Sequence, residues 1–189
     1  ADYIVVLGTT AEVSSLSDLE KKTVLKAVIG ANKNKLPLII GIGGNNTAKV
    51  IDEIQSTDLN PFQAILSVSP YYNKPTQEGI YEHYKHIAKS SPLPIIVYNV
   101  PSRTGSNIEP HTFIRLAEEI ENIIGIKDAS GDMDQAQQML KHCAPHIQVI
   151  SGDDSLTLPM LLAGAVGTIS VLGNAIPVPL KEIFHFVEM

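Results

Sequence analysis

Short apolar runs alternate with longer amphipathic segments along the whole chain. Seven runs are short and rich in β-branched residues, as buried strands are; they cover residues 4–7, 38–40, 64–68, 95–98, 123–126, 147–150 and 165–171. The segments between them have apolar residues at helical spacing; they predict helices at 17–32, 47–55, 77–89, 111–121 and 133–142, one ending near 163, and one beginning near 179.

This alternation of strand and helix is typical of an α/β fold with a parallel sheet covered on both faces. An open doubly wound sheet and a closed (β/α)8 TIM barrel both fit the pattern. Seven strands and an abrupt start at Ala1 favour the barrel, without its first strand–helix unit and its C-terminal helical region. We therefore expect residues 1–189 to be a single barrel domain, incomplete at both ends and internal to a longer protein.

Composition excludes several other classes of protein. The chain is 44% hydrophobic and 18% charged, as globular proteins are. Its net charge of −6 without a basic cluster argues against nucleic acid as a partner, and no run of apolar residues is long enough for a membrane span. The single cysteine, Cys143, fits a cytoplasmic protein, and the histidines lack the spacing of metal ligands, so we expect no metal.

Reactive residue types follow the ends of the predicted strands, where parallel α/β folds place their chemistry; they are Thr9, Thr10, Tyr71, Tyr72, Tyr98, Lys127 and Gly152. Each alone has a simpler explanation: a turn cap for the threonines, rim packing for the tyrosines, and a solvated strand-end ammonium for the lysine. Arg103, in the loop after the fourth strand, is by default a surface cation.

Together these residues suit imine chemistry. A desolvated lysine forms an imine with a 2-oxo acid, and a neighbouring tyrosine hydroxyl can relay the protons that the reaction requires. Threonine hydroxyls and backbone N–H groups can hold the substrate carboxylate. The protonated imine is itself the electron sink, so the chemistry requires no metal and no organic cofactor.

Four motifs resemble the dihydrodipicolinate synthase family, within the N-acetylneuraminate lyase-like class I aldolases. They are residues 8–12 (GTTAE), 69–75 (SPYYNKP), 98–105 (YNVPSRTG) and 125–131 (GIKDASG). The resemblance runs from Ala1 to about Asn174. It implies a (β/α)8 lyase that condenses pyruvate with L-aspartate 4-semialdehyde to 4-hydroxy-tetrahydrodipicolinate, on the route to lysine and diaminopimelate.

The same resemblance implies four catalytic residues. Lys127 would carry the pyruvate imine, and Tyr98 would relay protons while hydrogen-bonded to Thr9. Tyr72 would complete the relay from the neighbouring subunit of a tight dimer, two of which commonly form a homotetramer.

Four further residues would bind substrate. Thr10 would hold the pyruvate carboxylate, and Arg103 would receive the carboxylate of L-aspartate 4-semialdehyde. Gly152 and Ile169 would line the imine pocket.

Three positions depart from the lysine-inhibited members of this family, which tend to have Ser, His and Glu there. The present chain has Val13, Lys21 and Lys49 instead. The ammonium of a lysine ligand would meet Lys49 where a carboxylate is usual, and like charges repel. We therefore expect weak or absent feedback by lysine.

Two alternative functions stay open at this point. One is another pyruvate-dependent aldolase, such as N-acetylneuraminate lyase or a 2-keto-3-deoxy-sugar-acid aldolase. Arg103 and the pair Tyr71–Tyr72 favour a short acidic aldehyde over a polyol chain. The other, from a different class, is a non-catalytic barrel that binds small acids, or an inactive fragment.

Overall fold

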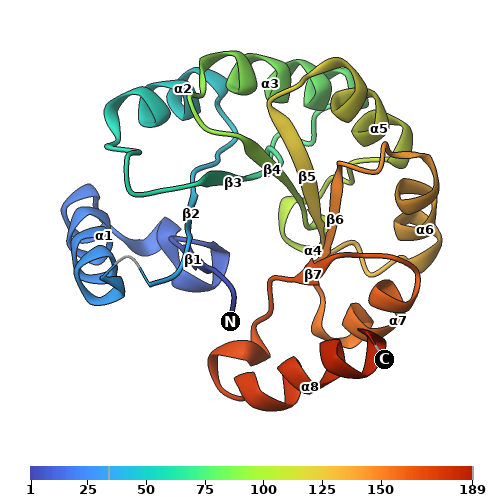
Figure 1. The fold of residues 1–189 in the computed structure, drawn as a ribbon. Coiled ribbons are helices and arrows are strands. Elements are labelled where there is room, and N and C mark those ends of the chain that lie inside the picture. Colours follow the sequence, from blue (N-terminus) through green and yellow to red (C-terminus); the bar gives the residue numbers. More distant parts are fainter. Residues whose placement is uncertain (34, 189) are drawn as a thin grey trace.

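A computed structural model describes residues 1–33 and 35–188, and its centre is one parallel sheet. The seven strands are β1 (Ile4–Val6), β2 (Leu38–Gly41), β3 (Ala64–Val68), β4 (Ile95–Asn99), β5 (Ile123–Asp128), β6 (Gln148–Ser151) and β7 (Gly167–Thr168). They pair in chain order from β1 to β7, and every pair is parallel. A doubly wound sheet reverses its strand order at a switch point, so this order confirms barrel-type winding. The sheet curls accordingly, with β1 and β7 at its two ends (Figure 1).

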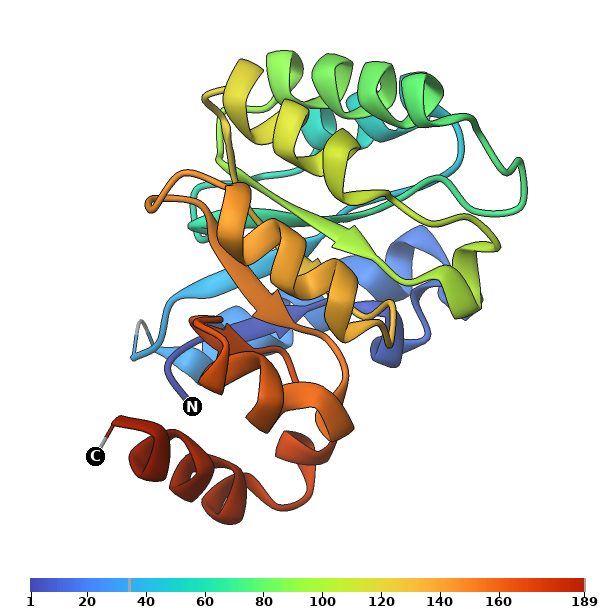
Figure 2. The ribbon, with the colours of Figure 1, turned by 90° about the vertical axis from the view of Figure 1, so that its right-hand side faces the viewer.

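Helices connect the strands and cover the outside of the curl. They are α1 (Asp18–Asn32), α2 (Thr47–Ser56), α3 (Gln77–Ser90), α4 (Pro101–Thr104), α5 (Pro110–Glu119), α6 (Met133–His142), α7 (Thr157–Leu162) and α8 (Pro177–Glu188). Helices α3, α5 and α6 (green, yellow and orange) form one layer outside the strands (Figure 2). The predicted helices are therefore present with small shifts at their ends, whereas the single-turn α4 was not predicted.

A capping box begins α1. The Ser17 backbone N–H and hydroxyl donate to Glu20 Oε2 at 2.8 and 2.7 Å, and the Glu20 N–H donates to the Ser17 hydroxyl at 3.4 Å. These bonds satisfy N–H groups that lack a partner within the helix.

Apolar side chains lie on both faces of the sheet, which explains the uninterrupted apolar runs. The outer face packs against the helices through residues such as Ile65, Val97 and Ile126. The inner face forms a second cluster, which includes Leu66, Ile96, Tyr98 and Ile150. Since side chains alternate along a strand, Tyr98 points into the interior of the curl.

Strand β7 is shorter than the predicted 165–171. Only two of its residues pair with β6, Gly167 with Ile150 and Thr168 with Ser151. The Ile169 N–H still donates to Ser151 O at 2.9 Å, and the chain then leaves the sheet and forms the single turn η4 (Leu172–Asn174).

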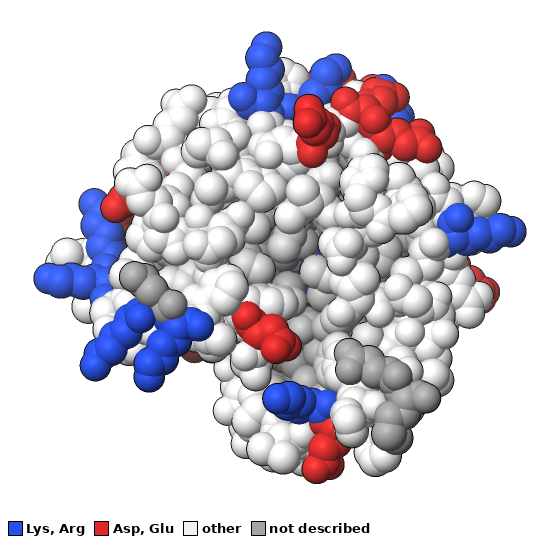
Figure 3. All heavy atoms as spheres, viewed as in Figure 1, with Lys and Arg blue, Asp and Glu red and all other residues white. Residues whose placement is uncertain are grey.

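Charges of both signs lie mainly around the periphery of the molecular face seen in Figure 3. Within the described residues, no helix is both long and apolar enough to cross a membrane.

Candidate active site at the strand ends

Lys127 lies near the end of β5 with its side chain against Tyr98 of β4. The two residues are register partners on adjacent strands. The Nζ atom of Lys127 is 4.2 Å from the centroid of the Tyr98 ring, within the range of a cation–π contact. Only 8% of the lysine surface is exposed. The strand register therefore makes the predicted nucleophile and the predicted proton relay direct neighbours.

The surroundings of Lys127 favour its neutral, nucleophilic form. Burial and, to a smaller extent, the nearby Arg103 lower the pKa of Lys127, and the carboxylate of Asp154 opposes them, so that the pKa falls from 10.5 to about 8. At pH 7 about one molecule in ten then has a free amine, against about one in three thousand for an ordinary lysine. Such an amine can attack a carbonyl carbon at neutral pH.

Tyr98 keeps its proton at neutral pH and can donate it. Burial raises the pKa of the Tyr98 hydroxyl, while hydrogen bonding with Thr9 and the charge of Arg103 partly offset that rise. Thr9 belongs to the single turn η1 (Thr9–Ala11), directly after β1. The structure therefore places Thr9 beside Tyr98 and Tyr98 beside Lys127.

Gly152 makes room for the lysine side chain. A Cβ atom at this position would lie 2.9 Å from Lys127 Cε and 2.8 Å from Ala129 Cβ. The Gly152 N–H donates to Asp128 O at 2.7 Å, which fixes the loop after β6 against the end of β5. The half-buried Ile169 packs on the inner apolar cluster that contains Tyr98. Both predicted pocket residues thus lie in the interior, near Tyr98 or Lys127.

A cavity of about 350 Å³ opens beside Tyr98, and Thr9, Tyr71 and Arg103 are among the residues that line it. Tyr98 joins this cavity to Lys127, since it contacts both. An arginine at the wall of a cavity suits a carboxylate ligand, which a guanidinium binds in bidentate geometry.

Two predicted residues are not part of this arrangement within the chain. Tyr72 is 88% exposed and has a φ of 71°, and its N–H donates to Thr104 O at 3.2 Å. Thr10, next to Thr9 in η1, is also exposed. The single chain leaves the Tyr72 ring in solvent.

Asp154 is a charged neighbour of Lys127 to which sequence reasoning assigned no role. Its carboxylate accepts the Ser170 hydroxyl and the backbone N–H groups of Val171 and Leu172, the latter two at 3.1 and 2.9 Å. These bonds tie the loop after β6 to the loop after β7. The only signal in the sequence was a pair of aspartates after a strand, which does not reveal their partners.

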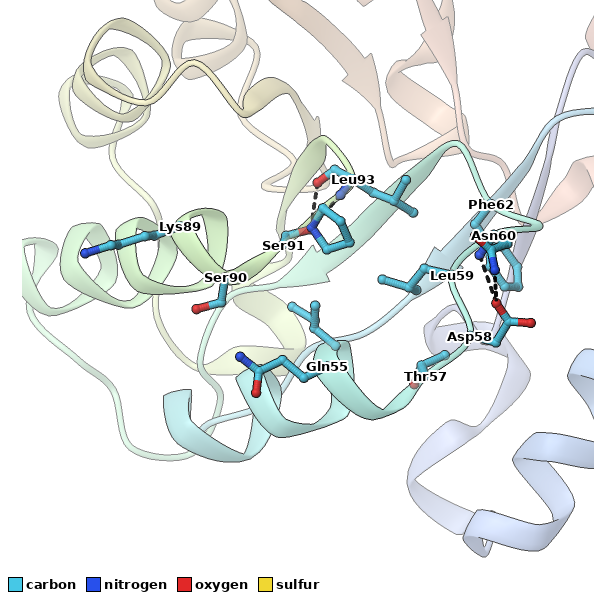
Figure 4. Close-up of a pocket in the computed structure, with 12 residues that line it drawn as sticks. Gln55, Thr57, Asp58, Leu59, Asn60, Phe62, Lys89, Ser90, Ser91 and Leu93 are labelled. Carbon is cyan, nitrogen blue, oxygen red and sulfur yellow. Dashed lines mark hydrogen bonds between the residues drawn. The ribbon is translucent and has the colours of Figure 1, made fainter.

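A larger hollow, of about 810 Å³, lies at the opposite ends of β3 and β4 (Figure 4). Several of its polar groups bond to one another. Asp58 Oδ1 accepts the Asn60 side-chain amide at 2.9 Å, and the Ser91 hydroxyl donates to Leu93 O at 2.6 Å. None of the predicted site residues lines it, so its size does not indicate the site of the chemistry.

Among the described residues, no group of three His, Cys, Asp or Glu side chains could hold a metal ion. The amine of Lys127, the hydroxyls of Tyr98 and Thr9 and the guanidinium of Arg103 suit carbonyl and carboxylate chemistry.

Comparison with known proteins agrees with this geometry. The chain matches the Dihydrodipicolinate synthetase family over residues 1–188. It is 55% identical to the 4-hydroxy-tetrahydrodipicolinate synthase of Flavobacterium psychrophilum and 48% identical to that of Parabacteroides distasonis, in both cases over 188 residues and 100% of the chain. It spans 63% and 62% of these two relatives.

A solved structure shows the same fold. The dihydrodipicolinate synthase of Acinetobacter baumannii, crystallised in complex with pyruvate, superimposes with a TM-score of 0.93 at 43% identity, over 100% of this chain and 64% of that one. The chain therefore belongs to the dihydrodipicolinate synthetase family.

Proposed function

We propose that this chain provides the reactive strand ends of a Schiff-base lyase that condenses pyruvate with L-aspartate 4-semialdehyde to 4-hydroxy-tetrahydrodipicolinate. The observation that carries the proposal is the buried Lys127, whose Nζ lies 4.2 Å from the Tyr98 ring centroid. A lysine with this burial and a pKa near 8 is suited to imine formation. Family membership supports the choice of substrates, and the pyruvate complex of the Acinetobacter relative supports the 2-oxo acid.

The first half of the reaction forms the imine. Lys127 Nζ attacks C2 of pyruvate, and the carbinolamine then loses its hydroxyl as water to give the protonated imine. The Tyr98 hydroxyl, with Thr9 behind it, carries protons to and from the carbinolamine oxygen. Thr10 holds the pyruvate carboxylate, and Gly152 and Ile169 bound the space around the imine.

The second half forms the carbon–carbon bond. C3 of the imine loses a proton to give an enamine, which attacks the aldehyde carbon of the second substrate while the aldehyde oxygen takes up a proton. Arg103 binds the carboxylate of that substrate, because its guanidinium lines the cavity beside Tyr98. The substrate's own amine then replaces Lys127 at C2, which closes the ring and frees the lysine.

The proposed active unit is a tight dimer, two of which form a tetramer. Tyr72, exposed on its own chain, completes the proton relay of the neighbouring subunit. Its exposure of 88% supports a role outside its own chain. A dimer interface covers exposed aromatic rings of this kind.

We also propose that lysine binds this protein weakly or not at all. Val13 and Lys21 line the cavity, and Lys21 faces the half-buried Glu53, whose pKa it lowers against the larger effect of burial. The Glu53 carboxylate thus already has the cationic Lys21 beside it, and Lys49, which like Glu53 belongs to α2, adds a second positive charge. Both cations oppose the binding of a lysine ammonium. Calorimetry that detects micromolar binding of lysine to the full-length protein would refute this proposal.

Borohydride trapping tests the proposed function. The full-length protein is incubated with pyruvate, reduced with borohydride and digested, and mass spectrometry locates the adduct. We expect a reduced pyruvate adduct on Lys127 and none in Lys127→Ala. A folded protein without this adduct would refute the lyase, and faster turnover with a sugar aldehyde than with the semialdehyde would favour a different pyruvate aldolase.

A further inference from the structure

A network of buried polar side chains lies on the outer face of the sheet, directly behind Lys127. Asp128 follows Lys127 in β5 and points to the opposite face, because side chains alternate along a strand. It accepts hydrogen bonds from Asn99 of β4 and Gln135 of α6, and both of these bond in turn to Asn107 of the loop between α4 and α5. We call these four residues the amide network.

The Asp128 carboxylate is held by neutral donors. Its Oδ1 accepts Asn99 Nδ2 at 3.0 Å and Gln135 Nε2 at 3.3 Å, and its Oδ2 accepts the Ser130 hydroxyl at 2.7 Å. The residue is 3% exposed, and no lysine or arginine of the described chain pairs with it. A buried carboxylate accepts hydrogen bonds but donates none, so it orients every amide around it.

The amide network reaches the loop that follows Arg103. Asn99 Nδ2 also donates to Asn107 Oδ1 at 2.8 Å, and Asn99 Oδ1 accepts the Ile108 N–H at 3.0 Å. Asn107 Nδ2 in turn donates to Gln135 Oε1 at 2.7 Å. Residues 107–108 thereby have a fixed position relative to β5, and they end the segment that begins with α4 and carries Arg103.

We propose that Asp128 is a positioning residue, which through Asn99 and Asn107 holds the Arg103 segment (residues 101–108) in place relative to Lys127. The end of strand β5 then aligns both substrates. Lys127 on the inner face binds the 2-oxo acid, and Asp128 on the outer face positions Arg103, which binds the carboxylate of the second substrate. The inference rests on the proposed function, because it concerns the binding of the second substrate at that site.

Two substitutions break the link from opposite ends. Asp128→Asn replaces an acceptor by a donor that faces Asn99 and Gln135, and Asn107→Ala removes the loop side of the network without altering β5. Each should raise the KM for L-aspartate 4-semialdehyde about tenfold, about the upper end of what one lost hydrogen bond contributes, and change pyruvate trapping on Lys127 by less than about twofold. The double variant should resemble the single ones, because both changes break the same link.

Ser130→Ala is the matched control. It removes a hydrogen bond of Asp128 on the loop after β5 but leaves both bonds of Oδ1, so the KM for the semialdehyde should stay near that of the unsubstituted protein. If Asp128→Asn fails to fold, the half-buried Asn107→Ala decides the question.

Three results would overturn the inference. One is an unchanged KM in folded Asn107→Ala, and another is an equal loss of trapping and of semialdehyde binding, which would indicate general damage. The third is the absence of a pyruvate adduct in the unsubstituted protein, which would refute the proposed function as well. An adduct together with an unchanged KM would refute this inference alone.

Discussion

Replacing Gly152 by alanine should disable Lys127 while leaving the fold intact. The new Cβ would stand 2.9 Å from Lys127 Cε, 2.8 Å from Ala129 Cβ and 3.1 Å from Asp128 O. Non-bonded carbon atoms prefer separations of about 3.5–4.0 Å. The lysine side chain must therefore move by roughly 0.5–1 Å to restore an ordinary contact.

The substitution should lower the rate of imine formation more than the stability of the fold. A displacement of about 1 Å at a reacting group can cost about 100-fold in rate, whereas overpacking typically costs about 1–3 kcal/mol of stability. Lys127 Cε can move with its flexible side chain, whereas Ala129 Cβ and Asp128 O can move only with the backbone, so we expect a stability loss within that range. Imine formation should slow by about 10–100-fold.

Timed borohydride trapping with pyruvate measures the imine rate, and thermal unfolding measures the stability. Gly30→Ala is the control, because Gly30 lies in α1 with no atom within 4 Å of a Cβ there. Alanine at this helical position should stabilise the protein by about 0.5–1 kcal/mol and leave trapping unchanged. If Gly152→Ala formed the pyruvate adduct as fast as the unsubstituted protein, Lys127 would not need the space that Gly152 leaves.

Three further predictions use other properties of the site and core. The imine rate should rise with pH through about 8, because Lys127 must lose its proton; a midpoint near 10.5 would contradict its burial. Tyr98→Phe should slow imine formation by about 100-fold and keep the fold, so normal turnover would refute the relay. Burial, and then His86, lower the pKa of His83 from 6.5 to about 4. As the pH falls, His83 therefore binds a proton in the unfolded chain at a higher pH than in the folded chain. The free energy of unfolding should for this reason fall by about 2 kcal/mol between pH 7 and pH 5. Urea unfolding of His83→Gln should show a smaller fall, and an equal fall would exclude His83 as its source.

The fold was predictable where an element has enough residues to show a period. Six of the strands contain short apolar runs, and these runs coincide with the observed strands to within one or two residues. The apolar run at 165–171 predicted a longer strand than the structure has, since only Gly167 and Thr168 pair with β6. Helix α4 has four residues, too few for a helical period, although Pro101 occupies its first turn as prolines often do.

The parallel topology of the sheet made part of the site predictable from the sequence. Lys127 and Tyr98 each follow an apolar run, so a parallel sheet places them on one rim, and the register makes them neighbours. The contacts of Asp154 were not predictable, since they depend on where the loop after β7 turns back. Tyr72 was assigned to a partner chain by family resemblance, and its exposure is compatible with that assignment without showing it.

The reactivity of Lys127 depends on three strand ends rather than on its own strand. Burial against Tyr98 of β4 lowers the pKa of the lysine, and Asp154, after β6, raises it again. Asp154 is itself held by the Ser170 hydroxyl and the N–H groups that follow β7. The pKa of about 8 is thus a balance between desolvation, the carboxylate of Asp154 that opposes it, and the smaller effect of Arg103, which lowers the pKa further. A lysine with the same burial but without that carboxylate would be still less basic, so the loop after β7, which positions Asp154, helps to set the pKa of Lys127.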